Sequence, residues 1–142
     1  GDNFDPDTSH VIPALIVKAH AAKTTVQSSI EIWGTGLPLR EFMHVDDLAD
    51  ALVHLLKTYS GLTHINIGSG EEISIHELAQ CVADTVGFNG KLVFDSSKPD
   101  GAMRKLLDAT RMNKLDWAPS IHLKEGLEST YKWYLQNVVE PT

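Results

Sequence analysis

A segment near the middle of the chain, residues 33–42, combines an aromatic ring, a glycine-rich turn and an arginine. The indole of Trp33 can stack on a base or a sugar, and the guanidinium of Arg40 can bind a phosphate through two parallel hydrogen bonds. The same residues also suit a hairpin with Trp33 in the core and Arg40 paired to Glu41 or Asp46. The residue types alone favour the hairpin.

A later loop, residues 96–105, gathers positive charge in an acidic protein. Lys98 is followed by Pro99-Asp100-Gly101, and then by Arg104 and Lys105. Three cations in one loop suit a diphosphate. A solvated loop is the commoner outcome for such a charge cluster.

His10 stands in a small, polar loop at the start of an apolar helical pattern. An imidazole in this place can exchange protons near neutral pH, although a structural role is the better expectation from the residues alone. The seven histidines are scattered, and no pair has the i, i+4 spacing of a zinc-binding helix. We therefore predict no metal site.

Two glycine-rich turns do not match a dinucleotide-binding fingerprint. The turn at 34–36 lacks the third glycine and precedes a proline-containing strand, whereas the fingerprint opens a helix. The turn at 68–70 ends in two glutamates, whose charges would repel a pyrophosphate. Both are interpreted as plain turns.

Composition predicts one globular core. The 142 residues are 42% hydrophobic and 22% charged, with a formal net charge of −7. The negative charge argues against a nucleic-acid or anionic-membrane partner, and the apolar runs are too short for a membrane span. Cys81 excludes a disulfide framework, because it is the only cysteine, and it is interpreted as a small core residue in a reducing cytoplasm.

Helical and strand-like patterns alternate along the chain, which predicts an α/β fold. Helices are expected near residues 11–23, 46–59, 74–86, 110–117 and 123–138, and strands near 28–33, 40–45, 64–68 and 91–95. Expected helix caps are Thr8 or Ser9, Asp46 or Asp47, and Ser74 in a capping box with Glu77. The strands are too few for a complete doubly wound sheet, and the chain opens in a loop with no strand before it.

In their order along the chain, these segments resemble the C-terminal part of the GDP-L-fucose synthase family, a branch of the extended short-chain dehydrogenases. The resemblance is carried by the motifs Asp2-Asn3-Phe4, Ser9-His10-Val11-Ile12-Pro13-Ala14-Leu15, Trp33-Gly34-x-Gly36-x-Pro38-x-Arg40-Glu41-Phe42-x-His44-Val45-Asp46-Asp47, His64-Ile65-Asn66-Ile67-Gly68, Phe94-Asp95-x-Ser97-Lys98-Pro99-Asp100-Gly101 and Arg104-Lys105-Leu106-Leu107-Asp108. The match runs from the first residue to about Leu135.

The resemblance implies a division of labour within a longer enzyme. An N-terminal Rossmann domain, absent from this chain, would bind NADP(H) and carry the Tyr-x-x-x-Lys and cysteine groups. Residues 1–142 would form the substrate-binding part. The complete enzyme would epimerise GDP-4-keto-6-deoxy-D-mannose and reduce it to GDP-L-fucose, as a homodimer. The isolated chain would be inactive and would not bind the cofactor tightly.

The resemblance also implies roles for single residues. His10 matches the second acid/base of the epimerisation and also a cofactor-binding position. The expected substrate-binding residues are Lys18, Trp33, Arg40, Asp100 and Lys105. Lys18 stands where the family usually has arginine, so it keeps the charge but loses the bidentate geometry.

Two alternatives stay open. The chain could be part of another nucleotide-sugar epimerase or dehydratase of the extended short-chain family, although a simple 4-epimerase needs no second acid/base pair at Ser9-His10. It could also be a non-catalytic module that binds a nucleotide sugar. An upstream reading frame with the glycine-rich fingerprint and Tyr-x-x-x-Lys would separate these alternatives.

Overall fold

The computed structural model describes residues 1–5 and 8–140, and it has the expected α/β character. The helices are α1 (Val11–Thr24), α2 (Val45–Thr58), α3 (Ile75–Val86), α4 (Thr110–Asn113) and α5 (Leu123–Tyr134), which continues as the π-helix η1 (Leu135–Val139). The strands are β1 (Ser29–Trp33), β2 (Leu39–Glu41), β3 (Glu72–Ser74), β4 (Lys91–Asp95) and β5 (Arg104–Lys105).

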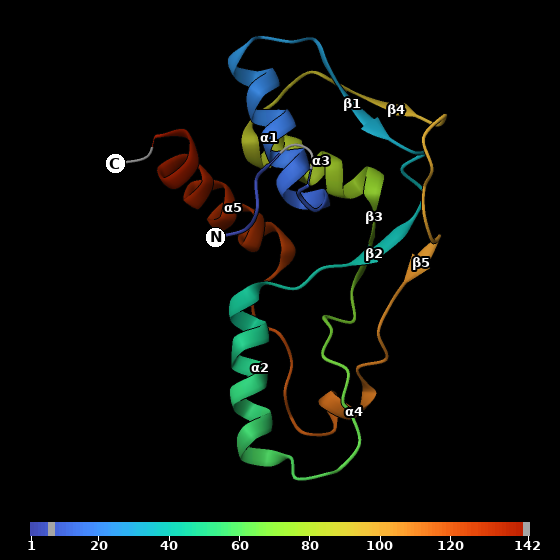
Figure 1. Ribbon diagram of the computed structural model, residues 1–142, viewed down its shortest axis with the longest axis vertical. Helices are drawn as coiled ribbons and strands as arrows, with labels where there is room; N and C mark the ends of the chain where they lie inside the picture. Colours follow the sequence, from blue (N-terminus) through green and yellow to red (C-terminus); the bar gives the residue numbers. More distant parts are fainter. Residues whose placement is uncertain (6–7, 141–142) are drawn as a thin grey trace.

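The molecule is elongated and has two lobes (Figure 1). The upper lobe contains α1, α3 and α5, with the parallel pair β1–β4 at one side. The lower lobe contains α2 and α4. The three-stranded sheet β3-β2-β5 lies where the lobes join, with β2 antiparallel to β3 and parallel to β5.

The main core belongs to the upper lobe and is built mostly from one face each of α1 and α3. Its largest fully buried aliphatic side chains are Ile16 on α1 and Leu78, Val82 and Val86 on α3. Ile30 and Ile32 of β1 join them, since alternate residues of a strand share one face. These are the core positions that the sequence pattern predicts for the three elements.

A smaller core holds the lower lobe together, with Ala51 of α2, Met112 of α4 and Trp117 at its centre. The indole N–H of Trp117 donates to the Asp50 carboxylate at 2.8 Å. Near the start of α2, the buried Asp47 carboxylate accepts hydrogen bonds from the backbone N–H groups of Ser120 and Ile121 at 3.1 and 3.0 Å. Asp47 thereby ties the lower lobe to the loop that leads into α5.

Helix caps were predicted correctly for α3 and wrongly for α1 and α2. Ser74 and Glu77 form the expected capping box. Helix α1 is instead preceded by His10, whose side chain makes no capping hydrogen bond. Helix α2 is capped by His44, whose Nδ1 accepts from the Asp46 N–H at 3.2 Å, so the strand expected over 40–45 already ends at Glu41.

Two other sequence predictions fail in the lower lobe. Residues 64–68 form no strand, and a helix stripe expected to be apolar and buried is mostly exposed: of Leu48, Ala51, Leu52, Leu55 and Leu56, only Ala51 is fully buried. The α5 prediction is nearly right, but regular helix gives way to π-helix after Tyr134. Within the described part of the chain, no helix is both long and apolar enough to cross a membrane.

Candidate functional site

The ring of Trp33 lies at the surface, between two lysines. Its side of β1 faces outward, and the residue is 63% exposed. The ammonium of Lys18 lies 5.7 Å from the ring centroid and that of Lys98 lies 5.5 Å from it. The expectation of a core tryptophan is therefore wrong. An exposed ring beside two cations offers a stacking face next to positive charge.

Lys18 and Lys98 reach Trp33 from different parts of the chain. Lys18 lies on α1, and its ammonium also donates to the Glu31 carbonyl at 3.2 Å, which holds it over β1. Lys98 lies in the loop after β4, which runs parallel to β1 with Asp95 opposite Trp33. Sequence analysis placed Lys98 in a basic loop but did not connect it with Trp33, because only the β1–β4 pairing brings the two together.

Asp100 closes the turn that follows Trp33. One carboxylate oxygen accepts from the Thr35 N–H and the other from the Thr35 hydroxyl, both at 2.7 Å. The turn needs glycine at position 34, where φ is +89° and a side chain would collide with the Asp100 carboxylate. Asp100 therefore fixes the loop after β4 against the loop after β1.

Arg40 and Lys105 are neighbours across the parallel pair β2–β5. The Arg40 guanidinium donates to the Leu39 carbonyl at 2.7 Å, and within the described residues it forms no ion pair with Glu41 or Asp46. Glu41 instead accepts from the backbone N–H groups of Gly70 at 2.6 Å and Leu107 at 3.1 Å. The predicted Arg40–Glu41 or Arg40–Asp46 pair is wrong.

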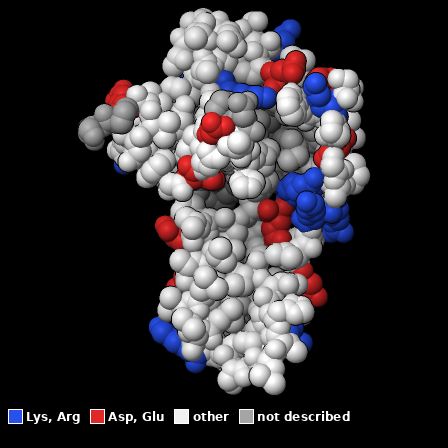
Figure 2. All heavy atoms as spheres, in the orientation of Figure 1, with Lys and Arg blue, Asp and Glu red and all other residues white. Residues whose placement is uncertain are grey.

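Arg104 differs from its neighbour Lys105, because its charge is already paired. It forms two hydrogen bonds with the Glu72 carboxylate, at 2.7 and 2.6 Å, which lower the pKa of that carboxyl. Figure 2 shows lysine and arginine side chains gathered over the region of β2 and β5. The charges there that no described acid pairs with are those of Arg40 and Lys105.

His10 lies apart from these contacts, at the beginning of α1. Its side chain is exposed, and it makes no hydrogen bond or ion pair with another described residue. Lys18 lies eight residues further along the same helix, which corresponds to a rise of about 12 Å. The neighbouring Ser9 hydroxyl is buried and has no hydrogen-bond partner in the described structure.

The two glycine-rich turns cannot serve as phosphate loops, because carboxylates already occupy their N–H groups. The Thr35 N–H points to Asp100, and the Gly70 N–H points to Glu41. A pyrophosphate would have to displace a negative charge from each turn. The described residues therefore do not fit the diphosphate of a dinucleotide cofactor.

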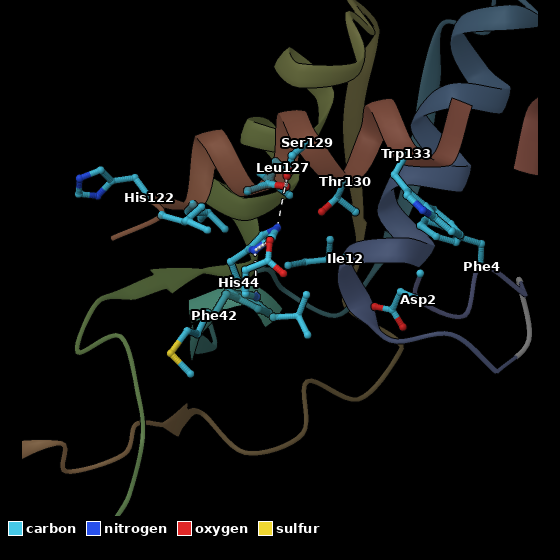
Figure 3. Close-up of a pocket in the computed structure, with 17 residues that line it drawn as sticks. Asp2, Phe4, Ile12, Phe42, His44, His122, Leu127, Ser129, Thr130 and Trp133 are labelled. Atoms are coloured by element: carbon cyan, nitrogen blue, oxygen red, sulfur yellow. Dashed lines mark hydrogen bonds and ion pairs between the residues drawn. The ribbon is translucent and has the colours of Figure 1, made fainter. Parts of the chain in front are cut away.

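The larger cavity, of about 610 Å³, lies elsewhere, between the N-terminal segment, the start of α2 and α5 (Figure 3). His44 lies at its centre, and Phe4 stacks on Trp133 at one end. His44 Nε2 lies 3.3 Å from the Ser129 hydroxyl. Since Nδ1 accepts from the Asp46 N–H, Nε2 carries the hydrogen and donates to Ser129.

None of the six predicted site residues lines this cavity or a second one, of about 460 Å³, that includes Cys81. The predicted residues lie on an open surface instead. Cys81 is half-buried, and burial raises the pKa of its thiol, as for a structural cysteine. No group of metal-ligating side chains was found among the described residues.

Comparison with known proteins gives a consistent picture. A family model described as the NAD dependent epimerase/dehydratase family matches residues 1–68. The chain is 57% identical over 138 residues to a probable GDP-L-fucose synthase 1 of Oryza sativa subsp. japonica, covering 97% of this chain and 42% of that protein. It is 48% identical over 145 residues to GDP-L-fucose synthase of Escherichia coli K12, covering 96% of this chain and 45% of that protein.

The fold matches as well. A GDP-L-fucose synthetase from Naegleria fowleri, solved also with NADP bound, superposes with a TM-score of 0.90 at 29% identity, over 98% of this chain and 43% of that one. The chain spans about two-fifths of the length of the curated relatives it matches. In sequence and in fold, it is a relative of the GDP-L-fucose synthases, similar to them over nearly all of its own length.

Proposed function

We propose that this chain is the substrate-binding part of a GDP-L-fucose synthase, which epimerises GDP-4-keto-6-deoxy-D-mannose and reduces it to GDP-L-fucose. The observation that carries the proposal is the surface formed by Trp33, flanked by Lys18 and Lys98, together with the neighbouring cations Arg40 and Lys105. A nucleotide sugar has the matching features, which are planar rings and two adjacent phosphates. The names of the relatives supply the identity of the sugar.

Each group has a distinct task in this proposal. Trp33 offers a flat face to a ring of the ligand, and Arg40 and Lys105 neutralise the diphosphate. Asp100 acts as a positioning residue, because both of its oxygens are engaged in holding the 34–36 turn beside Trp33. Lys18 keeps the positive charge expected at its position and shares it with the Trp33 ring.

His10 is the proposed acid/base for epimerisation. The substrate's ketone acidifies the adjacent carbons, so a base can remove a proton there and return it to the opposite face. An exposed imidazole with no partner among the described residues is free to take up and release that proton. A second acid/base is needed on the other face of the ring, and the resemblance assigns it to the part of the enzyme that would precede this chain.

NADP(H) belongs to the proposal only for the complete enzyme. The Naegleria relative supports it, because one of its structures has NADP bound. The glycine turns of this chain do not fit the cofactor's diphosphate, so we expect a Rossmann domain outside residues 1–142 to hold it. A homodimer and a cytoplasmic location are further parts of the proposal that rest on the resemblance.

A hybrid enzyme tests the proposal, with this chain replacing the matching two-fifths of the rice relative. We expect the hybrid to convert GDP-4-keto-6-deoxy-D-mannose and NADPH to GDP-L-fucose. Arg40→Ala should weaken use of the GDP-sugar, whereas Arg104→Ala, which removes an arginine already paired to Glu72, should have little effect. A hybrid that folds but binds no GDP-sugar would refute the proposal.

A further inference from the structure

The lower lobe has an apolar surface that nothing in the described structure covers. Helix α2 is apolar on two opposite sides. One side, around Ala51, packs against Met112 and Trp117. The other side, here called the outer face of α2, consists of Val45, Leu48, Leu52 and Leu56.

The outer face of α2 repeats every three or four residues, so its side chains lie in one row along the helix. Val45 is 67% exposed, Leu52 51% and Leu56 86%. Leu48 is also classed as exposed, and no charged residue belongs to the row. Such a row on an otherwise acidic protein fits an apolar protein surface better than a charged ligand.

Residues 64–68 provide a second, independent observation. Their sequence, His-Ile-Asn-Ile-Gly, alternates as a strand does, and Ile65 and Ile67 pack on the small core of the lower lobe. Yet the backbone of residues 65–67 makes no hydrogen bond with the backbone of any described residue. A segment with a strand pattern, one anchored face and open backbone groups is suited to pairing with a strand from elsewhere.

The lengths of the relatives indicate what covers this surface. About three-fifths of each of the three most similar curated relatives lies outside the region matched by this chain. Figure 1 shows α2 along one side of the lower lobe, with the segment around residue 65 returning along the lobe. A helix with an apolar row and a nearby unpaired strand are the two components that extend an α/β sheet with a helix on its face.

We infer that the outer face of α2 and the backbone of residues 65–67 form the docking surface for the cofactor-binding domain of the proposed enzyme. In the docked state, the row of α2 lies against that domain and residues 65–67 add a strand to its sheet. The inference rests on the proposed function for the identity of the domain. It also means that part of this chain completes the fold of its partner.

Hydrogen exchange of single amides tests the pairing. In the hybrid enzyme, the amides of Ile65 and Ile67 should exchange about 100-fold more slowly than in the isolated chain, because pairing must open before they exchange. Leu52→Asp combined with Leu56→Asp should remove most of that protection. Val93→Asp is the matched control, since Val93 is 49% exposed on β4 in the other lobe.

The same double substitution in the isolated chain separates docking from folding. There both leucines face solvent, so the midpoint of thermal unfolding should stay nearly unchanged, while in the hybrid it should fall. Equal exchange rates in the hybrid and the isolated chain would overturn the inference. So would a dimer of the isolated chain, seen by sedimentation, that protects the same amides.

The outcomes also distinguish this inference from the proposed function. Normal turnover of the GDP-sugar with unprotected amides at 65–67 would refute the docking surface and leave the function standing. Protected amides without turnover or binding of the GDP-sugar would refute the function and leave the docking surface standing.

Discussion

Replacing His10 by glutamine separates catalysis from folding unusually well. The His10 side chain is exposed and makes no hydrogen bond with another described residue, and it contributes no capping bond to α1. Surface substitutions of this kind change the free energy of unfolding by less than about 0.5 kcal/mol. His10→Gln should therefore leave the thermal midpoint of the hybrid enzyme unchanged.

The effect on the reaction should be large. A positioned general acid/base contributes about 10²- to 10⁴-fold to the rate, and glutamine cannot exchange a proton near neutral pH. Inversion of the sugar centres should slow by that factor. Exchange of solvent deuterium into the carbons beside the ketone, followed by NMR, should slow in parallel. Reduction of the ketone does not need His10 in the proposal, so reduced but un-inverted GDP-6-deoxyhexose should accumulate.

His122 supplies the matched control. It is also an exposed histidine at the N-cap of a helix, α5, and its side chain likewise makes no capping bond. His122→Gln should leave exchange, inversion and stability unchanged. Wild-type exchange rates in His10→Gln together with a lowered thermal midpoint would show that His10 has a structural role and would refute the assignment.

Three further predictions address binding and stability. Arg40→Ala should raise the KM for the GDP-sugar by about ten- to a thousandfold and leave that for NADPH unchanged, since a lost phosphate contact costs a few kcal/mol; equal changes in both would indicate a folding role. The isolated chain should show no micromolar NADPH binding in a fluorescence titration, because carboxylates occupy both of its glycine turns. Asp47→Ala should lower the free energy of unfolding by about 2–4 kcal/mol, measured with urea, because it leaves two buried N–H groups of the 120–121 loop without their acceptor, whereas the exposed Asp46→Ala should cost far less. Burial raises the pKa of Asp47, but the hydrogen bonds from Ser120 and Ile121 lower it further, so the net pKa lies below its usual value; the stabilisation is therefore complete above about pH 4 and is lost as the pH falls below that, and unchanged acid sensitivity in Asp47→Ala would contradict it.

Local patterns were sufficient wherever a short stretch of chain decides its own structure. The capping box of Ser74 and Glu77 and the left-handed Gly87 after α3 involve groups within a few residues of one another. The alternation of Ile30 and Ile32 likewise placed β1 correctly against the core. The α/β class followed from such patterns, and the motifs that identify the relatives are contiguous and could be read directly.

The candidate site required the tertiary structure, because its contacts join residues far apart in the chain. Thr35 and Asp100 are 65 positions apart, and Lys98 meets Trp33 only through the parallel pairing of β1 and β4. Sequence proximity suggested that Glu41 would neutralise Arg40. Adjacent side chains on a strand point to opposite faces, so Glu41 instead binds the backbone of Gly70 and leaves the Arg40 charge unpaired.

The sequence by itself determined which residues are apolar, which turns need glycine, and which protein family the chain resembles. It could not determine which apolar residues are buried within this chain. Leu52 and Leu56 fit a helical core pattern as well as Ala51 does, yet only the packing of Met112 and Trp117 decides that Ala51 faces inward. Burial depends on what lies across from a side chain, and periodicity reports only that some partner is needed.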